Sequence, residues 1–203
     1  MKKKAIVAVV ALVLVLCCAM GGTLAWLVAK TDPVVNTFTY GDINIDLSES
    51  ENLNLKMIPG NDITKDPKVT VEANSEACWL FVKVEESNNF DDFMTYAIAS
   101  GWTLYNTTTT GSDIKTDDTT DDTYVIYREV DANIANAGTS YQVLAGKEEY
   151  QNGYVTVNDA VTKKMFAALT EATRPTLTFT AYAVQSDNVT TVADAWTIAM
   201  GNN

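Results

Sequence analysis

Residues Cys78–Val84, with the sequence CWLFVKV, decide the fold. In an extended chain, successive side chains point to opposite faces. One face of this segment carries four apolar side chains, those of Cys78, Leu80, Val82 and Val84. The other face carries two aromatic side chains at its start, those of Trp79 and Phe81. A strand that is apolar on both faces is covered on both sides, so we expect a central strand of a sheet.

A second strand is expected at Thr176–Val184 (TLTFTAYAV). Its apolar side chains alternate with threonines and are expected to face a core: Leu177, Phe179, Ala181 and Ala183. Shorter alternating segments predict further strands at Thr37–Leu47, Leu53–Met57, Val69–Val71, Gly101–Tyr105, Tyr124–Val130 and Tyr141–Leu144. In the first of these the alternation changes phase at Gly41, which fits either a β-bulge or a strand with two half-apolar faces.

Few segments show helical spacing. Phe90–Ala99 fits a short helix, and a longer one is expected from a cap at Asn158 to about Ala172. A closing helix starts at Thr191, with Asp194 completing a capping-box-like start, and stops at Gly201. The polar tract 106–123 predicts a loop. Many short strands with turns between them predict a mainly β protein, an antiparallel β-sandwich with a few short peripheral helices.

The N-terminus carries an export pattern. Lys2, Lys3 and Lys4 precede an apolar run that ends at Gly21 and Gly22, and Thr23 and Ala25 occupy positions −3 and −1 of a signal-peptidase site before Trp26. The alternative is an uncleaved anchor, because the uncharged stretch 5–29 is long enough to span a bilayer. We therefore expect a signal peptide at 1–25, a spacer at 26–36 and one domain at 37–203.

Composition excludes several functions. Removal of the three N-terminal lysines takes the net charge from −12 to −15, which repels nucleic acid and anionic membranes. The chain contains no His, which excludes Ser-His-Asp and Cys-His nucleophile systems and His-ligated zinc. Only Cys78 remains after processing, so no intramolecular disulfide can form. We expect no enzyme and no cofactor.

The acidic tract 113–122 (DIKTDDTTDD) is the one weak candidate for a metal site. Clustered carboxylates could bind Ca²⁺, but the spacing lacks the EF-hand pattern and its closing Glu, so a solvated loop is favoured. The candidate ligands are Asp117, Asp118, Asp121 and Asp122.

Four stretches together resemble the TasA and camelysin (CalY) family, secreted proteins of Gram-positive bacteria that form extracellular biofilm-matrix fibres. GGTLAW (21–26) resembles the junction cut by the family's dedicated signal peptidase, SipW, and TFTYGDINIDL (37–47) resembles its first mature strand. Residues 57–84 resemble its Pro-Gly turn and strand pair, with Lys65 and Asp66 as its Lys-Asp pair, and residues 181–196 resemble its closing strand and helix. The middle, 88–164, matches nothing in the family.

The resemblance implies a jelly-roll-like sandwich, secretion to the cell surface or matrix, and self-association into fibres. The first residues of one processed subunit would complete the sheet of the next by β-strand addition. The donor would be the segment 26–35 (WLVAKTDPVV), whose apolar side chains are those of Trp26, Leu27, Val28, Val34 and Val35. The signal peptidase would act on the chain during export, and contact with a membrane would be limited to the signal segment. The alternative is a monomeric cell-surface binding or adhesion module, tethered if the N-terminus stays uncleaved.

Overall fold

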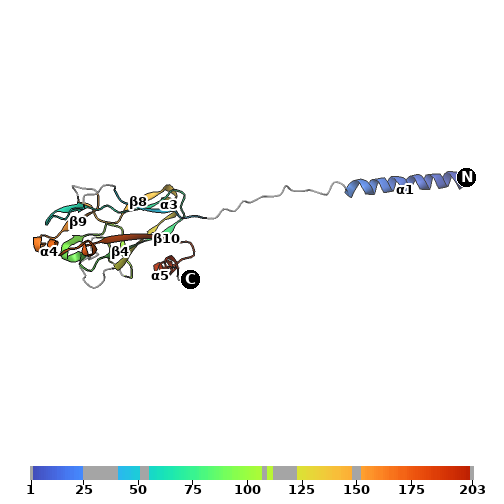
Figure 1. Cartoon of the computed structure of the whole chain (residues 1–203). Coiled ribbons are helices and arrows are strands. Elements are labelled where there is room, and N and C mark those ends of the chain that lie inside the picture. Colours follow the sequence, from blue (N-terminus) through green and yellow to red (C-terminus); the bar gives the residue numbers. More distant parts are fainter. Residues whose placement is uncertain are drawn as a thin grey trace. The chain divides into compact units, whose positions relative to one another are not determined.

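The computed structural model describes residues 2–24, 41–50, 55–106, 109–111, 123–147 and 152–201. The chain divides into two units, Met1–Thr39 and Tyr40–Asn203 (Figure 1). The first unit contains the helix α1 (Lys2–Leu24), which continues through Gly21 and Gly22. In α1, the side chains of residues 2–13 are described. Within the described side chains, no helix is both long enough and apolar enough to cross a membrane.

The second unit is built on a four-stranded antiparallel sheet. Its strand order is β10 (Leu177–Gln185), β4 (Cys78–Glu86), β7 (Thr123–Val130) and β6 (Thr103–Leu104). β4 pairs along its whole length with β10, from Cys78 opposite Gln185 to Glu86 opposite Leu177. The predicted central strand is therefore confirmed, with a long neighbour on each side.

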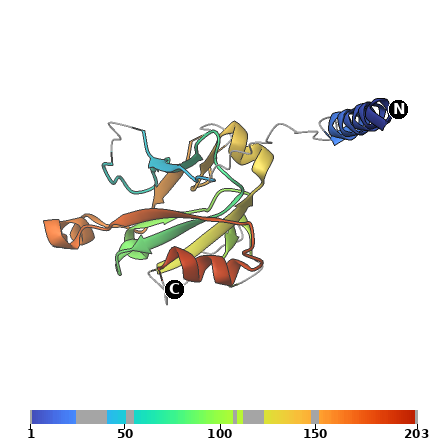
Figure 2. The ribbon, with the colours of Figure 1, turned by 90° about the vertical axis from the view of Figure 1, so that its right-hand side faces the viewer.

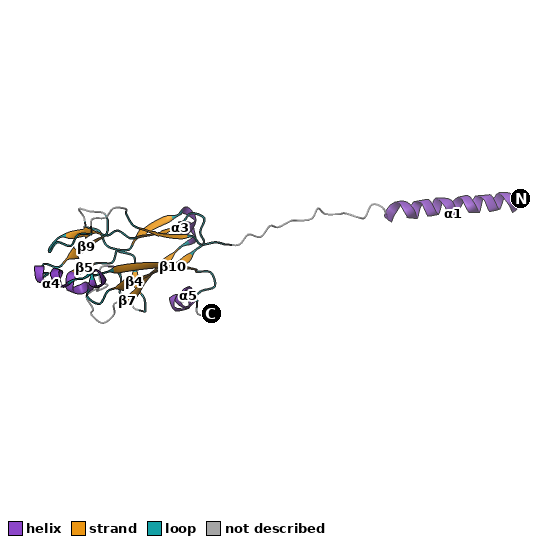
Figure 3. Ribbon diagram, in the orientation of Figure 1, coloured by secondary structure: helices purple, strands orange, loops and turns teal. Residues whose placement is uncertain are grey.

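Two smaller antiparallel sheets form the facing layer (Figure 3). One has the order β1 (Ile45–Ser48), β3 (Lys68–Val71) and β8 (Thr139–Gln142). The other has the order β2 (Asp62–Thr64), β9 (Tyr154–Val157) and β5 (Met94–Tyr96). Isolated bridges between Ile98 and Leu144 and between Gly146 and Gly153 join the two sheets. The result is the predicted mainly β, antiparallel sandwich.

Both faces of β4 are buried, as its sequence predicts. Leu80, Val82 and Val84 belong to the core between the layers, together with Val69 and Val71 of β3, and all five are fully buried. On the outer face, Phe81 is also fully buried, and it belongs to a second apolar cluster.

The helix α5 (Val192–Ala199) covers this outer face (Figure 2). The ring of Trp196 lies 5.2 Å from that of Phe81. The helix starts as predicted, because Thr191 Oγ1 accepts a hydrogen bond from the Asp194 N–H at 3.1 Å and donates one to Asp194 Oδ2 at 2.7 Å. At the other end, Gly201 has a φ of +71°, which ends the helix as expected.

Several predicted elements are wrong in part. The described part of Leu53–Met57 contains no strand; the strand nearby is β2. Phe90–Ala99 forms only the one-turn helix α2 (Phe90–Phe93) before β5 begins. Met94, Tyr96 and Ile98 are all buried, so the alternation of a strand outweighs the helical spacing.

The helix expected from Asn158 begins later. α4 spans Lys163–Ala168 and is capped by Thr162, followed by the 3₁₀ helix η2 (Glu171–Thr173). Asn158 instead follows the unpredicted strand β9, and its side-chain amide donates to the carbonyl of Asp91 at 2.8 Å. A further short helix, α3 (Ala132–Ala137), was also not predicted.

The first strand is shorter than predicted. β1 begins at Ile45, and the described residues before it, from Gly41, lie outside any strand. Gly41 is therefore not a bulge within a strand. Residues 37–40 lie outside the described part.

Replacing Phe81 by Ala tests the double-sided burial of β4. Loss of a fully buried ring should lower the free energy of unfolding by about 3 to 5 kcal/mol. Lys83→Ala, on the same face of the same strand but partly exposed, should change it by less than about 1 kcal/mol. Denaturant unfolding measures both, and equal effects would contradict this view of the outer face.

Candidate functional site

The outermost strand of the four-stranded sheet, β10, has an open edge. Among the described residues, its one strand partner is β4. Thr176 O accepts a hydrogen bond from the Ser87 N–H, and the Ser186 N–H donates to Ala77 O, so the even-numbered residues of β10 direct their backbone groups toward β4. By alternation, the N–H and C=O groups of five residues point away from β4: Leu177, Phe179, Ala181, Ala183 and Gln185.

The core side of this strand is incompletely covered. Leu177, Phe179, Ala181 and Ala183 pack against the main core, as predicted, yet each stays partly exposed. The same holds for Ile45 and Leu47 of β1, the outermost strand of the facing layer. The sandwich is therefore less completely packed along the side where β1 and β10 lie than at its centre.

A groove lies on this side of the sandwich. It consists of two cavities of about 610 and 330 Å³, which share Lys65, Leu177 and Thr178 in their lining. The apolar lining of the larger one includes Leu55, Met57, Phe90, Met94, Val155 and Leu177. The smaller one is lined by Leu47 of β1 and Phe179 of β10, among others. An open strand edge thus runs beside an apolar groove.

Lys65 and Asp66 fix the rim of the groove. Lys65 Nζ lies 2.7 and 2.8 Å from the two carboxylate oxygens of Glu49, and 5.6 Å from the centre of the Phe179 ring. The carboxyl group of Asp66 is fully buried, and it accepts hydrogen bonds from the N–H of Ser50 at 3.0 Å and from its hydroxyl at 2.5 Å. The two side chains therefore hold residues 49 and 50, which follow β1, against the sandwich.

The chain enters the sandwich far from the larger cavity. Asn44 O accepts a hydrogen bond from the Glu72 N–H at 2.8 Å, next to the segment that is bonded to α3 through Asn74 and Asn136. The larger cavity lies near α4 instead, because its lining includes Glu171 of η2, the 3₁₀ helix that follows α4. α3 and α4 lie at opposite ends of the sandwich (Figure 1).

Most of the predicted site residues lie outside the described part of the chain. Thr23 belongs to α1, but its side chain is not described. The remaining predicted site residues lie wholly outside the described part: Ala25, Trp26, Leu27, Val28, Val34, Val35, Asp117, Asp118, Asp121 and Asp122. The described residues contain no group of three His, Cys, Asp or Glu side chains that could hold a metal ion. The groove itself was not predicted, since its lining comes from segments far apart in the sequence.

Cys78 lies fully buried in the core rather than in the groove. Burial raises the pKa of its thiol to about 11. The thiolate is the reactive form of cysteine, so this environment suits a packing residue.

Comparison with protein-family models, with curated proteins and with solved structures finds no match to this chain.

Replacing Asp66 by Ala tests the support of the groove rim. The change leaves the Ser50 N–H without its acceptor, so we expect the free energy of unfolding to fall by about 2 kcal/mol. Asp46→Ala, in the adjacent strand β1 with its side chain exposed, should change it by less than about 0.5 kcal/mol. Denaturant unfolding compares the two, and equal values would show that Asp66 does not hold the rim.

Proposed function

We propose that this protein is a secreted structural subunit of extracellular fibres. The segment 26–35 of one processed subunit adds as a strand to the open edge of β10 in the next, and its apolar side chains fill the groove. The observation that carries the proposal is the pairing of an unpaired strand edge with an apolar groove along the same side of the sandwich. In strand addition, backbone hydrogen bonds supply affinity and side-chain pockets supply specificity.

The lengths of donor and acceptor match. β10 has nine residues and the donor segment has ten. At about 3.3 Å per residue in a strand, a donor of this length spans the whole edge. Pro33 lacks a backbone N–H, so it belongs at a position whose N–H would point away from the acceptor strand.

The composition of the donor suits the groove. Five of its ten residues are large and apolar: Trp26, Leu27, Val28, Val34 and Val35. Their burial would also cover Leu177 and Phe179, which are partly exposed in the isolated sandwich. Burial of apolar area contributes roughly 25 cal/mol per Å² to the free energy of association. Apolar side chains of both subunits would therefore stabilise the contact.

The position of the chain's entry favours a donor from another molecule. Residues 41–44 lie at the α3 end of the sandwich, and the larger cavity lies at the α4 end. A segment that precedes residue 41 would have to turn back along the sandwich to fill the cavity of its own domain. Insertion into a neighbour instead gives a head-to-tail contact, which repeats into a filament.

Deletion of residues 26–35 from the processed chain tests the donor. The truncated protein should remain a folded monomer without filaments, because it keeps the sandwich and loses the added strand. Electron microscopy and analytical ultracentrifugation measure assembly, and circular dichroism measures folding. A chain in which a Gly-Ser linker of equal length replaces 26–35 controls for spacing. Filaments from either variant would rule out this donor, whereas a processed wild-type chain that stays monomeric would favour a monomeric binding module.

Replacing Ala181 by Pro tests the acceptor edge. The N–H of Ala181 points away from β4, so its loss leaves the β10–β4 pairing intact and removes one donor from the open edge. We expect at least a tenfold lower rate of fibre growth, measured by light scattering, from a chain that still folds.

Ala181→Ser is the matched control, because it changes the same side chain and keeps the N–H. It should assemble at close to the wild-type rate. Equal rates for the Pro and Ser variants would place the growing contact elsewhere.

A further inference from the structure

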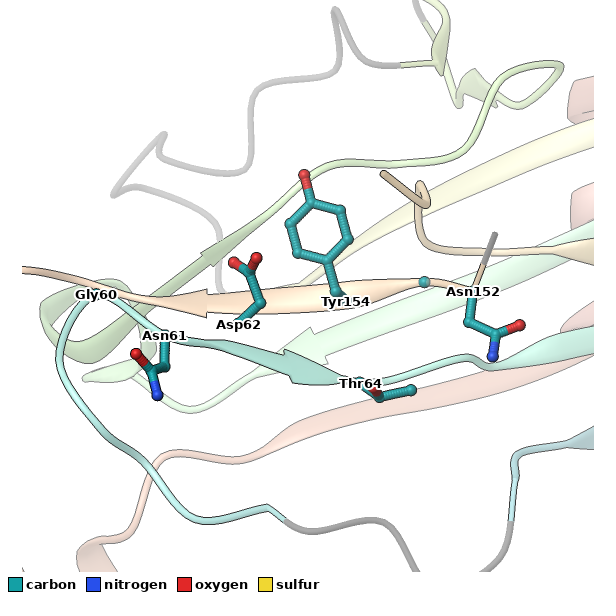
Figure 4. Close-up of a pocket in the computed structure, with 7 residues that line it drawn as sticks. Gly60, Asn61, Asp62, Thr64, Asn152 and Tyr154 are labelled. Atoms are coloured by element: carbon teal, nitrogen blue, oxygen red, sulfur yellow. The ribbon is translucent and has the colours of Figure 1, made fainter. Parts of the chain in front are cut away.

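A second concave site lies on the opposite face of the β2–β9 pair. It is a pocket of about 440 Å³, and its lining contains two glycines and five polar side chains, Asn61, Asp62, Thr64, Asn152 and Tyr154 (Figure 4). Among the described residues, no aliphatic side chain lines it. Small-molecule sites of this size usually have mostly apolar linings, so the chemistry of this pocket selects a different class of ligand.

The sheet separates this pocket from the groove. Along β2 and β9, Ile63 and Val155 are buried toward the core, and Val155 lines the groove. Asp62 and Tyr154 alternate with them and project to the outer face. The pocket therefore stays open whether or not the groove is filled, so a ligand can bind there independently of the proposed fibre contact.

Four side chains around the pocket have free hydrogen-bonding capacity. Those of Asn61, Thr64, Asn152 and Tyr154 make no hydrogen bond to any residue in the described part of the chain. Each side-chain amide both donates and accepts, and so does each hydroxyl. A Cβ at Gly60 would clash with the Asp159 carboxylate, and a Cβ at Gly153 would clash with Lys65 O, so the chain packs too closely at both positions for a larger residue.

The charge in the pocket is balanced. Asp62 forms an ion pair with Lys147 and accepts a hydrogen bond from Thr156 Oγ1 at 2.6 Å. The hydrogen bond from Lys147 is the main cause that lowers the pKa of Asp62. Near pH 7 the carboxylate is therefore negative, and its charge is cancelled by that of Lys147. Lys147 Nζ also lies 4.6 Å from the centre of the Tyr154 ring. Because Lys147 already neutralises Asp62, the pocket does not suit a free metal cation.

We propose that this pocket binds a neutral oligosaccharide. Sugar hydroxyls both donate and accept hydrogen bonds, and they match the amides and hydroxyls that have no hydrogen-bond partner among the described residues. An apolar ligand would find no aliphatic surface here, and an anionic one would be repelled by a chain with a net charge of −12. The ligand class is therefore a hydroxyl-rich, uncharged chain of the kind found in extracellular polysaccharides.

Titration of the full-length protein with cellotetraose, N-acetylchitotetraose and tetragalacturonic acid tests the proposal. The protein is kept in a detergent without a sugar headgroup, and binding is followed by isothermal titration calorimetry and by amide chemical shifts. At least one neutral tetramer should bind and shift the amides of residues 60–64 and 152–154. Tetragalacturonic acid should bind at least tenfold more weakly. Absence of binding by both neutral tetramers at about 10 mM, roughly ten times the concentration at which a ligand with a Kd of 1 mM half-saturates its site, would overturn the proposal.

The double variant Asn61→Ala, Asn152→Ala should bind the neutral tetramer about tenfold more weakly, because two pairs of amide hydrogen bonds are lost. Asn136→Ala is the matched control, since that residue is exposed on α3 and does not line the pocket. It should bind as the wild type does. Both variants change exposed side chains, and their amide spectra report whether they fold. Equal affinities in the two variants, tighter binding of the anionic tetramer, or shifts confined to other residues would each overturn the assignment.

Discussion

Burial of both faces of β4 is the constraint on which the rest of the structure depends. Its inner side chains, led by Leu80 and Val82, require a facing layer, and β3 supplies one. Its outer ring, Phe81, requires a separate cover, which α5 supplies. A nine-residue strand with two apolar faces also needs a hydrogen-bonding partner on each side, and β7 and β10 supply these. Of these two partners, β7 has a further neighbour in β6, whereas β10 is the outermost strand of the sheet among the described residues.

The edge strand carries the consequence of this arrangement. β10 has a core-facing alternation as regular as that of β4, but it has a strand partner on one side only within the described residues. Leu177 and Phe179 are therefore partly exposed, whereas Leu80 and Val82 are fully buried. The core-facing side chains of β10 are thus as apolar as those of a strand inside a sheet. The strand itself, however, lies at the edge of the sheet within the described residues. One further strand would resolve this mismatch, and it would do so most completely if its own side chains reached the groove.

The sequence predicted the long strands and the last helix well, because their periodicity is strong and their turn residues are local. It failed where two periods coincide. Phe90, Met94 and Ile98 satisfy a helical spacing, and Met94, Tyr96 and Ile98 satisfy a strand equally well; the surrounding sheet decides between them. β2 and β9, which have three and four residues, were not predicted. The groove and the polar pocket depend on which segments the topology brings together, and no local pattern encodes that.

An open apolar edge is also a hazard, since it invites pairing with any extended chain. Two features of this protein limit that risk. The net charge of −12 keeps copies apart at long range, and the pair formed by Lys65 and Glu49 places charged groups at the rim of the groove. A partner must therefore bring enough matched apolar side chains to outweigh repulsion and the loss of chain entropy. Random acidic segments fail this condition, and a segment of ten residues with five large apolar side chains can meet it. Under the proposed strand addition, the same charges that hinder aggregation would make the edge selective for the partner whose side chains fit the groove.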